Sequence, residues 1–352
     1  MNAPKPTSTA GRSCPLHYRY APSVFHANAA HTCEVLYVVG GLYGNEHALA
    51  RVLALFAAER GTKKLVFNGD FNWFNIAPQA FERVNTAVLG HLATRGNVET
   101  ELKPQGSAPH DEGDEADNDA GCGCAYPDWV GDEVVRHSNT IMRRLRATAQ
   151  QFPQLVARLA QLPMHLRVDV GAHKVGIVHG DAESLAGWGF AQENLGNPAH
   201  AARLAQWFAQ AQVDVFACSH TCLPVFYAGD SGGQVQAKGA APIVLNNGAA
   251  GMPNFAGTPH GLLTRIATHP YTGSARAFGL PANTRAELHM DAIAVQFDTA
   301  QWQQAFLAQW PTGSAAHDSY WSRISAGPNY QVAQAIIAAQ TTEPHLLEKT
   351  TC

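Results

Sequence analysis

Four short polar motifs follow predicted strands, and each carries a side chain that can bind a metal ion. Asp70 follows the strand-like run 64–67, Asn97 follows the next predicted strand, and His179 and His220 follow two later ones. The carboxyl ends of strands in open α/β sheets form the ligand crevice. Carboxylate, amide and imidazole groups suit a hard or borderline cation. We therefore predict a metal site formed by Asp70, Asn97, His179 and His220.

Alternating strands and helices are predicted to position these motifs. Residues 34–39 form a β-branched run that ends in glycines, and residues 46–59 carry apolar residues at helical spacing. The resulting βαβαβ order predicts a sheet that is parallel at least in this half. The other predicted strands are 64–67, 92–97, 165–170, 174–179, 213–218, 242–246, 262–268 and 292–297; the other predicted helices are 81–89, 133–151, 154–162, 201–211 and a weak one at 331–340.

Composition excludes several classes of protein. The net charge of the 352-residue chain is −4 and no run is rich in Lys or Arg, so we expect no nucleic-acid partner. No stretch reaches the roughly 18 apolar residues of a membrane span, and the first residues lack the apolar core of a signal peptide. Seven cysteines, an odd number, are unlike a disulfide framework. We expect reduced thiols in a cytoplasmic protein without a membrane partner.

The order of the motifs resembles the calcineurin-like metallophosphoesterase superfamily, whose pattern is D-x-H … G-D-x-x-D … G-N-H-D/E … H … G-H-x-H. The resemblance covers about 35–222 and continues into Asn246-Asn247-Gly248-Ala249-Ala250, which is similar to the family's N-P-G-S turn. It implies a four-layer α/β/β/α sandwich with two mixed sheets. The expected divisions are an extension at 1–33, the phosphoesterase-like domain at 34–300 with an insertion at about 100–132, and a helical tail at 301–352.

Departures from the family pattern fall mainly on one of its two metal sites. Tyr43 stands where D-x-H ends, Val98 replaces the histidine that would protonate the leaving group, and Cys222 replaces the last histidine. Carried over by motif, one site keeps Asp70, Asn97, His179 and His220. The other keeps only Asp70, with Tyr43 and Cys222 as candidate replacement ligands.

The resemblance also implies a cofactor and a substrate. We expect one or two divalent ions per chain, Mn, Fe or Zn, and a small phosphate-containing substrate near Asn45 and Asn72. Loss of a general acid typically costs on the order of 10²–10⁴ in rate, most severely for poor leaving groups.

The insertion at about 100–132 contains an acidic run at 110–119 and the pair Cys122 and Cys124. The acidic run predicts a solvated, partly disordered segment, and a protein partner could bind there. If the loop folds over the crevice, both cysteines could join Cys222 and rebuild the lost site around zinc or iron. The alternative is that all three are free thiols. A redox activity has less support because no C-x-x-C motif is present.

Two functions remain open from the sequence. The first is a metal-dependent phosphoesterase-like hydrolase that acts on a small phosphate ester or nucleotide by metal-activated water. The alternative is a non-catalytic protein that binds a ligand or partner on the same scaffold. The eroded site and Val98 favour the second function, and the retained four-ligand set favours at least metal binding.

Overall fold

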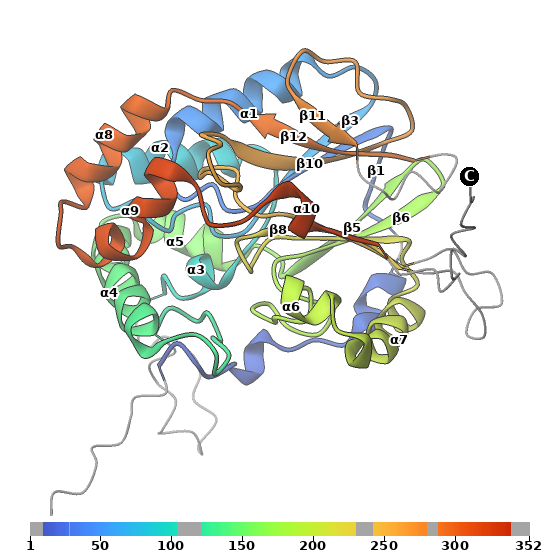
Figure 1. The fold of residues 1–352 in the computed structure, drawn as a ribbon, viewed down its shortest axis with the longest axis horizontal. Coiled ribbons are helices and arrows are strands. Elements are labelled where there is room, and N and C mark those ends of the chain that lie inside the picture. Colours follow the sequence, from blue (N-terminus) through green and yellow to red (C-terminus); the bar gives the residue numbers. More distant parts are fainter. Residues whose placement is uncertain (1–9, 28, 104–120, 230–241, 280–287, 339–352) are drawn as a thin grey trace, which may run out of the picture.

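The structure, a computed structural model, describes residues 10–27, 29–103, 121–229, 242–279 and 288–338 (Figure 1). The acidic run at 110–119 and its predicted partner site lie outside the described residues. Within the described part of the chain, no helix is both long enough and apolar enough to cross a membrane.

The strands predicted at 34–39, 64–67 and 92–97 lie in a six-stranded mixed sheet, together with strands from later in the chain. Its central strands are parallel, as predicted, and an antiparallel strand adjoins β2. In spatial order the strands are β11 (Ala277–Gly279), β12 (His289–Val295), β10 (Gly261–Ala267), β2 (Val35–Val39), β3 (Lys63–Asn68) and β4 (Leu92–Thr94).

The strands predicted at 165–170, 174–179, 213–218 and 242–246 lie in a seven-stranded mixed sheet. Its strands β6, β7 and β9 are parallel, and β5 and β6 form the predicted hairpin with Gly171 at φ +58° in its turn. In spatial order the strands are β1 (His31–Cys33), β5 (His165–Val170), β6 (His173–Val178), β7 (Val215–Cys218), β9 (Ile243–Asn247), β8 (Pro224–Ala228) and β13 (Ile336–Ala338).

Helices cover the outer face of each sheet (Figure 1). One layer packs on the six-stranded sheet and the other, with α6 and α7, packs on the seven-stranded sheet. The helices are α1 (Glu46–Ala58), α2 (Pro78–Val88), α3 (Asn97–Thr100), α4 (Asp132–Ala149), α5 (Pro153–Ala160), α6 (Gln192–Leu195), α7 (Ala201–Ala211), α8 (Thr299–Gln309), α9 (Ala315–Ala326) and α10 (Val332–Ala335).

Strand alternation explains why the sheets stack. Successive side chains of a strand point to opposite faces. In β2, Val35 and Tyr37 pack under the helices, whereas Leu36 and Val38 pack between the sheets. In β7, Phe216 likewise faces the helical layer. Both faces are covered, so these strands read as continuous apolar runs. The predicted four-layer sandwich with two mixed sheets is confirmed.

The last predicted helix is only partly right. Residues 332–335 form the short helix α10, but residues 336–338 form β13, which pairs in parallel with β8. The Ile336-Ile337 pair is β-branched, and pairing with the edge strand β8 outweighs a weak helical pattern. Residues 339 and 340 lie outside the described part.

Candidate metal centre

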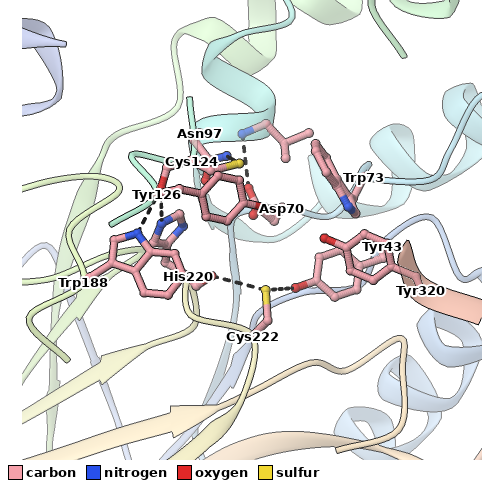
Figure 2. A pocket seen from close by; sticks show the side chains of 11 residues that line it. Tyr43, Asp70, Trp73, Asn97, Cys124, Tyr126, Trp188, His220, Cys222 and Tyr320 are labelled. Atoms are coloured by element: carbon pink, nitrogen blue, oxygen red, sulfur yellow. Dashed lines mark hydrogen bonds between the residues drawn. The ribbon is translucent and has the colours of Figure 1, made fainter. Parts of the chain in front are cut away.

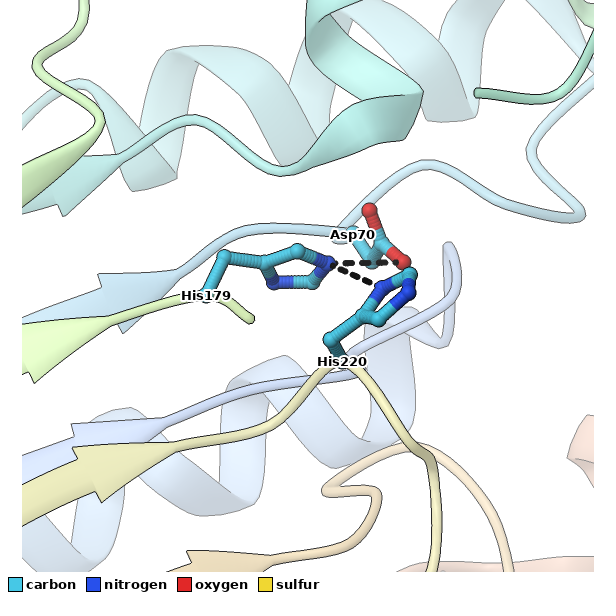
Figure 3. A group of neighbouring side chains, drawn as sticks. All are labelled: Asp70, His179 and His220. Atoms are coloured by element: carbon cyan, nitrogen blue, oxygen red, sulfur yellow. Dashed lines mark hydrogen bonds and ion pairs between the residues drawn. The ribbon is translucent and has the colours of Figure 1, made fainter. Parts of the chain in front are cut away.

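The carboxyl ends of four strands bring the predicted donors together where the two sheets meet. Asp70 follows β3, and Asn97 begins α3 after β4; β3 and β4 are neighbours in the six-stranded sheet. His179 follows β6 and His220 follows β7, both in the seven-stranded sheet. Figure 3 shows Asp70, His179 and His220 facing one another from these strand ends.

The side chains of Asp70, Asn97 and His220 all lie close to the same nitrogen of His179. His179 Nε2 is 3.3 Å from Asp70 Oδ2, 3.1 Å from Asn97 Oδ1 and 3.2 Å from His220 Nδ1. One ligand atom from each of Asp70, His179 and His220 lies within 4.8 Å of the others. All four residues are buried. This set is compact enough to surround one ion.

Backbone carbonyls orient three of these donors. His179 Nδ1 faces the carbonyl of Asn68 at 3.0 Å, and His220 Nε2 faces the carbonyl of Cys124 at 3.1 Å. Asn97 Nδ2 donates to the carbonyl of Cys122 at 2.9 Å. A carbonyl only accepts, so each facing nitrogen carries the proton. His179 Nε2, His220 Nδ1 and Asn97 Oδ1 are then left as acceptors toward the centre.

This donor set fits a divalent cation. Two imidazole nitrogens, one amide oxygen and one carboxylate converge, and outer hydrogen bonds of this kind commonly fix metal-binding histidines in one tautomer. Such nitrogen and oxygen ligands suit Zn, Fe or Mn.

Without a cation, His179 and Asp70 each favour the charged form of the other. Burial disfavours the charged imidazole of His179, but the Asp70 carboxylate outweighs burial and the pKa of His179 is raised. Burial likewise disfavours ionised Asp70, yet the charge of His179 lowers the pKa of Asp70. Burial and the neighbouring His179 lower the pKa of His220 to about 3. His220 is therefore neutral and ready to bind metal at neutral pH.

Left-handed backbone conformations concentrate at this site. Among the described residues, the non-glycine residues with positive φ are Tyr43, Asp70, Ala125, Gln212 and Cys222. Asp70 has φ 52°, Tyr43 has φ 55° and Cys222 has φ 62°, and all three line one cavity. Such conformations cost about 1–3 kcal/mol each and cluster at functional sites.

Glu99 holds Asp70 in its left-handed conformation. Its carboxylate accepts hydrogen bonds from the backbone N–H groups of Asp70 (2.8 Å), Phe71 (3.1 Å) and Gly96 (3.1 Å). Burial and the nearby Asp70 carboxylate raise the pKa of Glu99 to about 7. Glu99 therefore connects the turn after β3 to the start of α3.

A small cavity of about 40 Å³ opens beside the donors. This volume accommodates a few water molecules or a group of similar size. Figure 2 shows Tyr126 and Trp188 on one side of the cavity and Tyr43, Trp73 and Tyr320 on the other. The remaining lining residues are Asp70, Asn97, Val98, Cys124, His220 and Cys222.

Tyr43 and Cys222, the candidate replacement ligands, contact each other. The Tyr43 hydroxyl lies 2.8 Å from Cys222 Sγ, and Arg323 of α9 donates to the Cys222 carbonyl at 2.7 Å. Burial raises the pKa of both Tyr43 and Cys222, so both are protonated at neutral pH. Among the described residues, the metal-ligand group of His, Cys, Asp and Glu side chains contains no cysteine.

Cys122 and Cys124 are joined in a disulfide. Gly123, with φ +66°, turns the chain and brings their Cα atoms to 5.3 Å, within the usual range for a disulfide. The expectation of reduced thiols throughout the chain is wrong for this pair. The loop does fold over the centre, but these sulfurs bind each other. The remaining cysteines in the described residues are free.

Asn45 and Asn72 lie in the core near the cavity but do not line it. Asn45 caps α1, accepting from Ala48 N–H and donating to the carbonyl of Gly251. Asn72 exchanges hydrogen bonds with the amide of Asn85. Their amides are already bonded within the protein, and a role in substrate binding stays a prediction.

The sequence did not indicate most of the aromatic wall of the cavity, which consists of Tyr43, Trp73, Tyr126, Trp188 and Tyr320. Trp188 lies between two glycines shortly after the His179 motif, which is a signal that points to a residue in the crevice. Tyr320 comes from α9, far along the chain, where no pattern indicates the site.

No protein-family model and no curated protein matches this chain. Several solved structures are similar to it, including the following two. A metallophosphoesterase from Sphaerobacter thermophilus shares 17% identity over 86% of this chain and 100% of that chain, with a TM-score of 0.47. A hypothetical protein from Pyrococcus horikoshii OT3 shares 14% identity over 85% of this chain and 99% of that chain, with a TM-score of 0.51.

At 14% identity, the likeness to the Pyrococcus horikoshii protein concerns the fold alone. The two mixed sheets, their helical layers and the order of the motifs around the centre agree with it. The chain has the calcineurin-like metallophosphoesterase fold.

Proposed function

We propose that the chain is a metal-dependent phosphoesterase-like hydrolase that uses one divalent ion held by Asp70, Asn97, His179 and His220. The observation that carries the proposal is the convergence of ligand atoms from Asp70, His179 and His220 within 4.8 Å. Orientation of both histidines by backbone carbonyls supports it further.

In this proposal the residues of the chain hold the ion and orient the substrate, and the activation of water and of the phosphoryl group comes from the divalent ion. When bound, such an ion supplies Lewis-acid activation of water and of a phosphoryl oxygen. Asp70 contributes the negative charge of the ligand set, and the aromatic wall of the cavity limits access of bulk water. Val98 lines the cavity where the family's general acid would lie, and it has no proton to donate. Activated esters and anhydrides are therefore the preferred substrates.

The cavity favours a small phosphate group. It measures about 40 Å³, and no Lys or Arg is among its lining residues. A bound divalent ion would therefore be the main positive charge facing a phosphate. The metal identity (Mn, Fe or Zn), a cytoplasmic location and the absence of a nucleic-acid partner belong to this proposal.

A second candidate is a non-catalytic ligand- or partner-binding protein. The contact between Tyr43 and Cys222 favours it, because these neutral groups satisfy each other where the family places its other metal. In that case the protein would not hydrolyse a phosphate ester, although an ion would still bind to Asp70, His179 and His220.

Two variants test the metal site. We expect Asp70→Asn and His179→Gln to lose metal binding, because each removes one of four ligands while keeping side-chain size. The measurement is metal content after reconstitution and dialysis of the full chain. Asp169→Asn and His91→Gln, outside the centre, serve as matched controls. Unchanged metal content in both site variants would refute the assignment.

Hydrolysis is tested separately. The reconstituted wild-type protein should cleave an aryl phosphate, and Asp70→Asn should not. Stoichiometric metal without any cleavage would support the second candidate.

A further inference from the structure

The loop of residues 121–125, the C-x-C loop, supplies two of the three carbonyls that orient donors of the proposed metal centre. The Cys122 carbonyl accepts from Asn97 Nδ2 at 2.9 Å. The Cys124 carbonyl accepts from His220 Nε2 at 3.1 Å and from Trp188 Nε1 at 3.0 Å (Figure 2). Two of the four donors therefore depend on the position of this loop.

The disulfide restrains the Cys122 carbonyl directly and the Cys124 carbonyl through the Cα atom of Cys124. It closes a small ring that contains the carbonyl carbon of Cys122 and the Cα atom of Cys124. Gly123 turns the chain inside this ring at φ +66°, and a Cβ at this position would lie 2.2 Å from the Tyr18 hydroxyl oxygen. The turn at Gly123 therefore packs closely against the Tyr18 hydroxyl.

Other contacts fix the two flanks of the loop. Arg146 donates to the Gly121 carbonyl at 2.7 Å, and Asn139 accepts from Cys122 N–H at 2.9 Å. On the other side, Tyr126 N–H donates to the Gly11 carbonyl at 2.9 Å. These contacts keep the loop in place over the centre, whereas the ring contains the Cys122 carbonyl carbon and carries the Cys124 carbonyl as a substituent on one of its atoms.

We propose that the Cys122–Cys124 pair is a redox switch that sets the orientation of Asn97 and His220. In the disulfide form, both donors present an acceptor atom to the centre. In the dithiol form, the ring opens, the carbonyls rotate more freely, and the donors lose their fixed orientation. Weaker metal binding follows, and this consequence rests on the proposed function.

The switching step is thiol–disulfide exchange with a dithiol reductant. The reductant gives two electrons and two protons, its own sulfurs form a disulfide, and the bond between Cys122 and Cys124 breaks to give two thiols.

The first experiment compares zinc affinity in the two redox states of the full chain. One sample is reduced with dithiothreitol, which is removed anaerobically before titration, and mass spectrometry verifies the thiol count. Loss of orienting partners typically weakens metal binding by about 10–100-fold. We expect a loss of this size on reduction. The double variant Cys122→Ser/Cys124→Ser should bind zinc as the reduced protein does, with no redox response. Cys14→Ser, which keeps the pair, should respond like the wild type.

The second experiment reads His220 without any metal. Nitrogen-15 NMR of the imidazoles should show the Nε2–H tautomer of His220 in the disulfide form and a mixture of tautomers in the dithiol form. A tautomer change in a protein that binds no zinc in either state would support the switch and refute the metal site. An unchanged tautomer together with an unchanged zinc affinity, with both thiols verified, would overturn the switch.

Discussion

Single residues of this protein show which chemistry the fold retains and which it lacks. Asp70 is held in a left-handed conformation by Glu99, and the histidines are held by backbone carbonyls. By contrast, Val98 donates only its backbone N–H to Asp70, at 3.2 Å, and offers no acid to a leaving group. The proposed ligand positions therefore hold metal-binding side chains, whereas position 98 holds no proton donor in its side chain.

A histidine restored at position 98 tests this difference. Since a general acid matters most for poor leaving groups, we expect Val98→His to raise the rate on an alkyl phosphate by about 10²-fold or more, and the rate on an aryl phosphate much less. The measurement is kcat/KM for both esters, with Val98→Phe as a size control. Equal changes on the two esters would mean that position 98 does not face the leaving group.

The donors of the site could be predicted from the sequence, but much of their surroundings could not. Asp70, Asn97, His179 and His220 were predicted to converge because each is a metal-binding side-chain type that follows a strand, and the structure places the other three within 3.3 Å of His179 Nε2. Carbonyls such as that of Cys124 belong to every residue, so no pattern predicts which one will face an imidazole. The disulfide was missed because a two-residue separation gave no sign of the turn at Gly123.

At the scale of helices and strands, burial on both faces made the central elements predictable. The apolar runs of β2 and β3 and the amphipathic α4 lie within one or two residues of the predicted bounds. The strand β8 begins with proline and was not predicted. Helices α8 and α9 mix polar and aromatic residues without clear periodicity, so they were predicted only as a helical tail at 301–352, without bounds of their own. Their structure depends on tertiary contacts rather than on local pattern.

A buried ion-pair cluster joins α1 to two strands of the six-stranded sheet. Arg265 of β10 is fully buried; its Nε lies 2.8 Å from Glu59 Oε2 at the end of α1, and its Nη1 lies 3.1 Å from Asp291 Oδ2 of β12. Arg265→Ala leaves two carboxylates without their cation, so we expect a loss of about 3–5 kcal/mol in the free energy of unfolding.

Urea denaturation measures this loss, and Arg83→Ala is the matched control. The Arg83–Glu46 pair lies on the surface, with 62% of the Arg83 side chain exposed, so its removal should cost about 1 kcal/mol or less. Equal small effects of both substitutions would contradict the role assigned to the buried cluster.

At the scale of the whole molecule, residues 288–338 add to layers that are built by earlier parts of the chain. Trp302, Phe306 and Trp310 pack in the same core as β2 and α1, and Arg323 of α9 reaches the loop that carries Cys222. The strand β13 then extends the opposite sheet. The predicted divisions at 1–33, 34–300 and 301–352 stay a proposal, and the packing of α8 against the core of β2 and α1 is continuous across position 300.

Trp310 tests how strongly this segment is integrated. It is fully buried, donates from Nε1 to the Phe74 carbonyl at 2.9 Å and packs against the guanidinium of Arg144. We expect Trp310→Ala to cost about 3–5 kcal/mol in unfolding free energy. Trp129→Ala, at a side chain that is 60% exposed, should cost about 0.5 kcal/mol or less. A similar cost for both would show that the segment is only loosely attached.

The central claim concerns one divalent ion at the meeting point of the two sheets. Elemental analysis of the purified full chain, before and after reconstitution with Mn, Fe or Zn, measures this directly. We expect about one ion per chain, lost in Asp70→Asn. About two ions per chain would mean that Tyr43 and Cys222 complete a second site, and no ion after reconstitution would contradict the account.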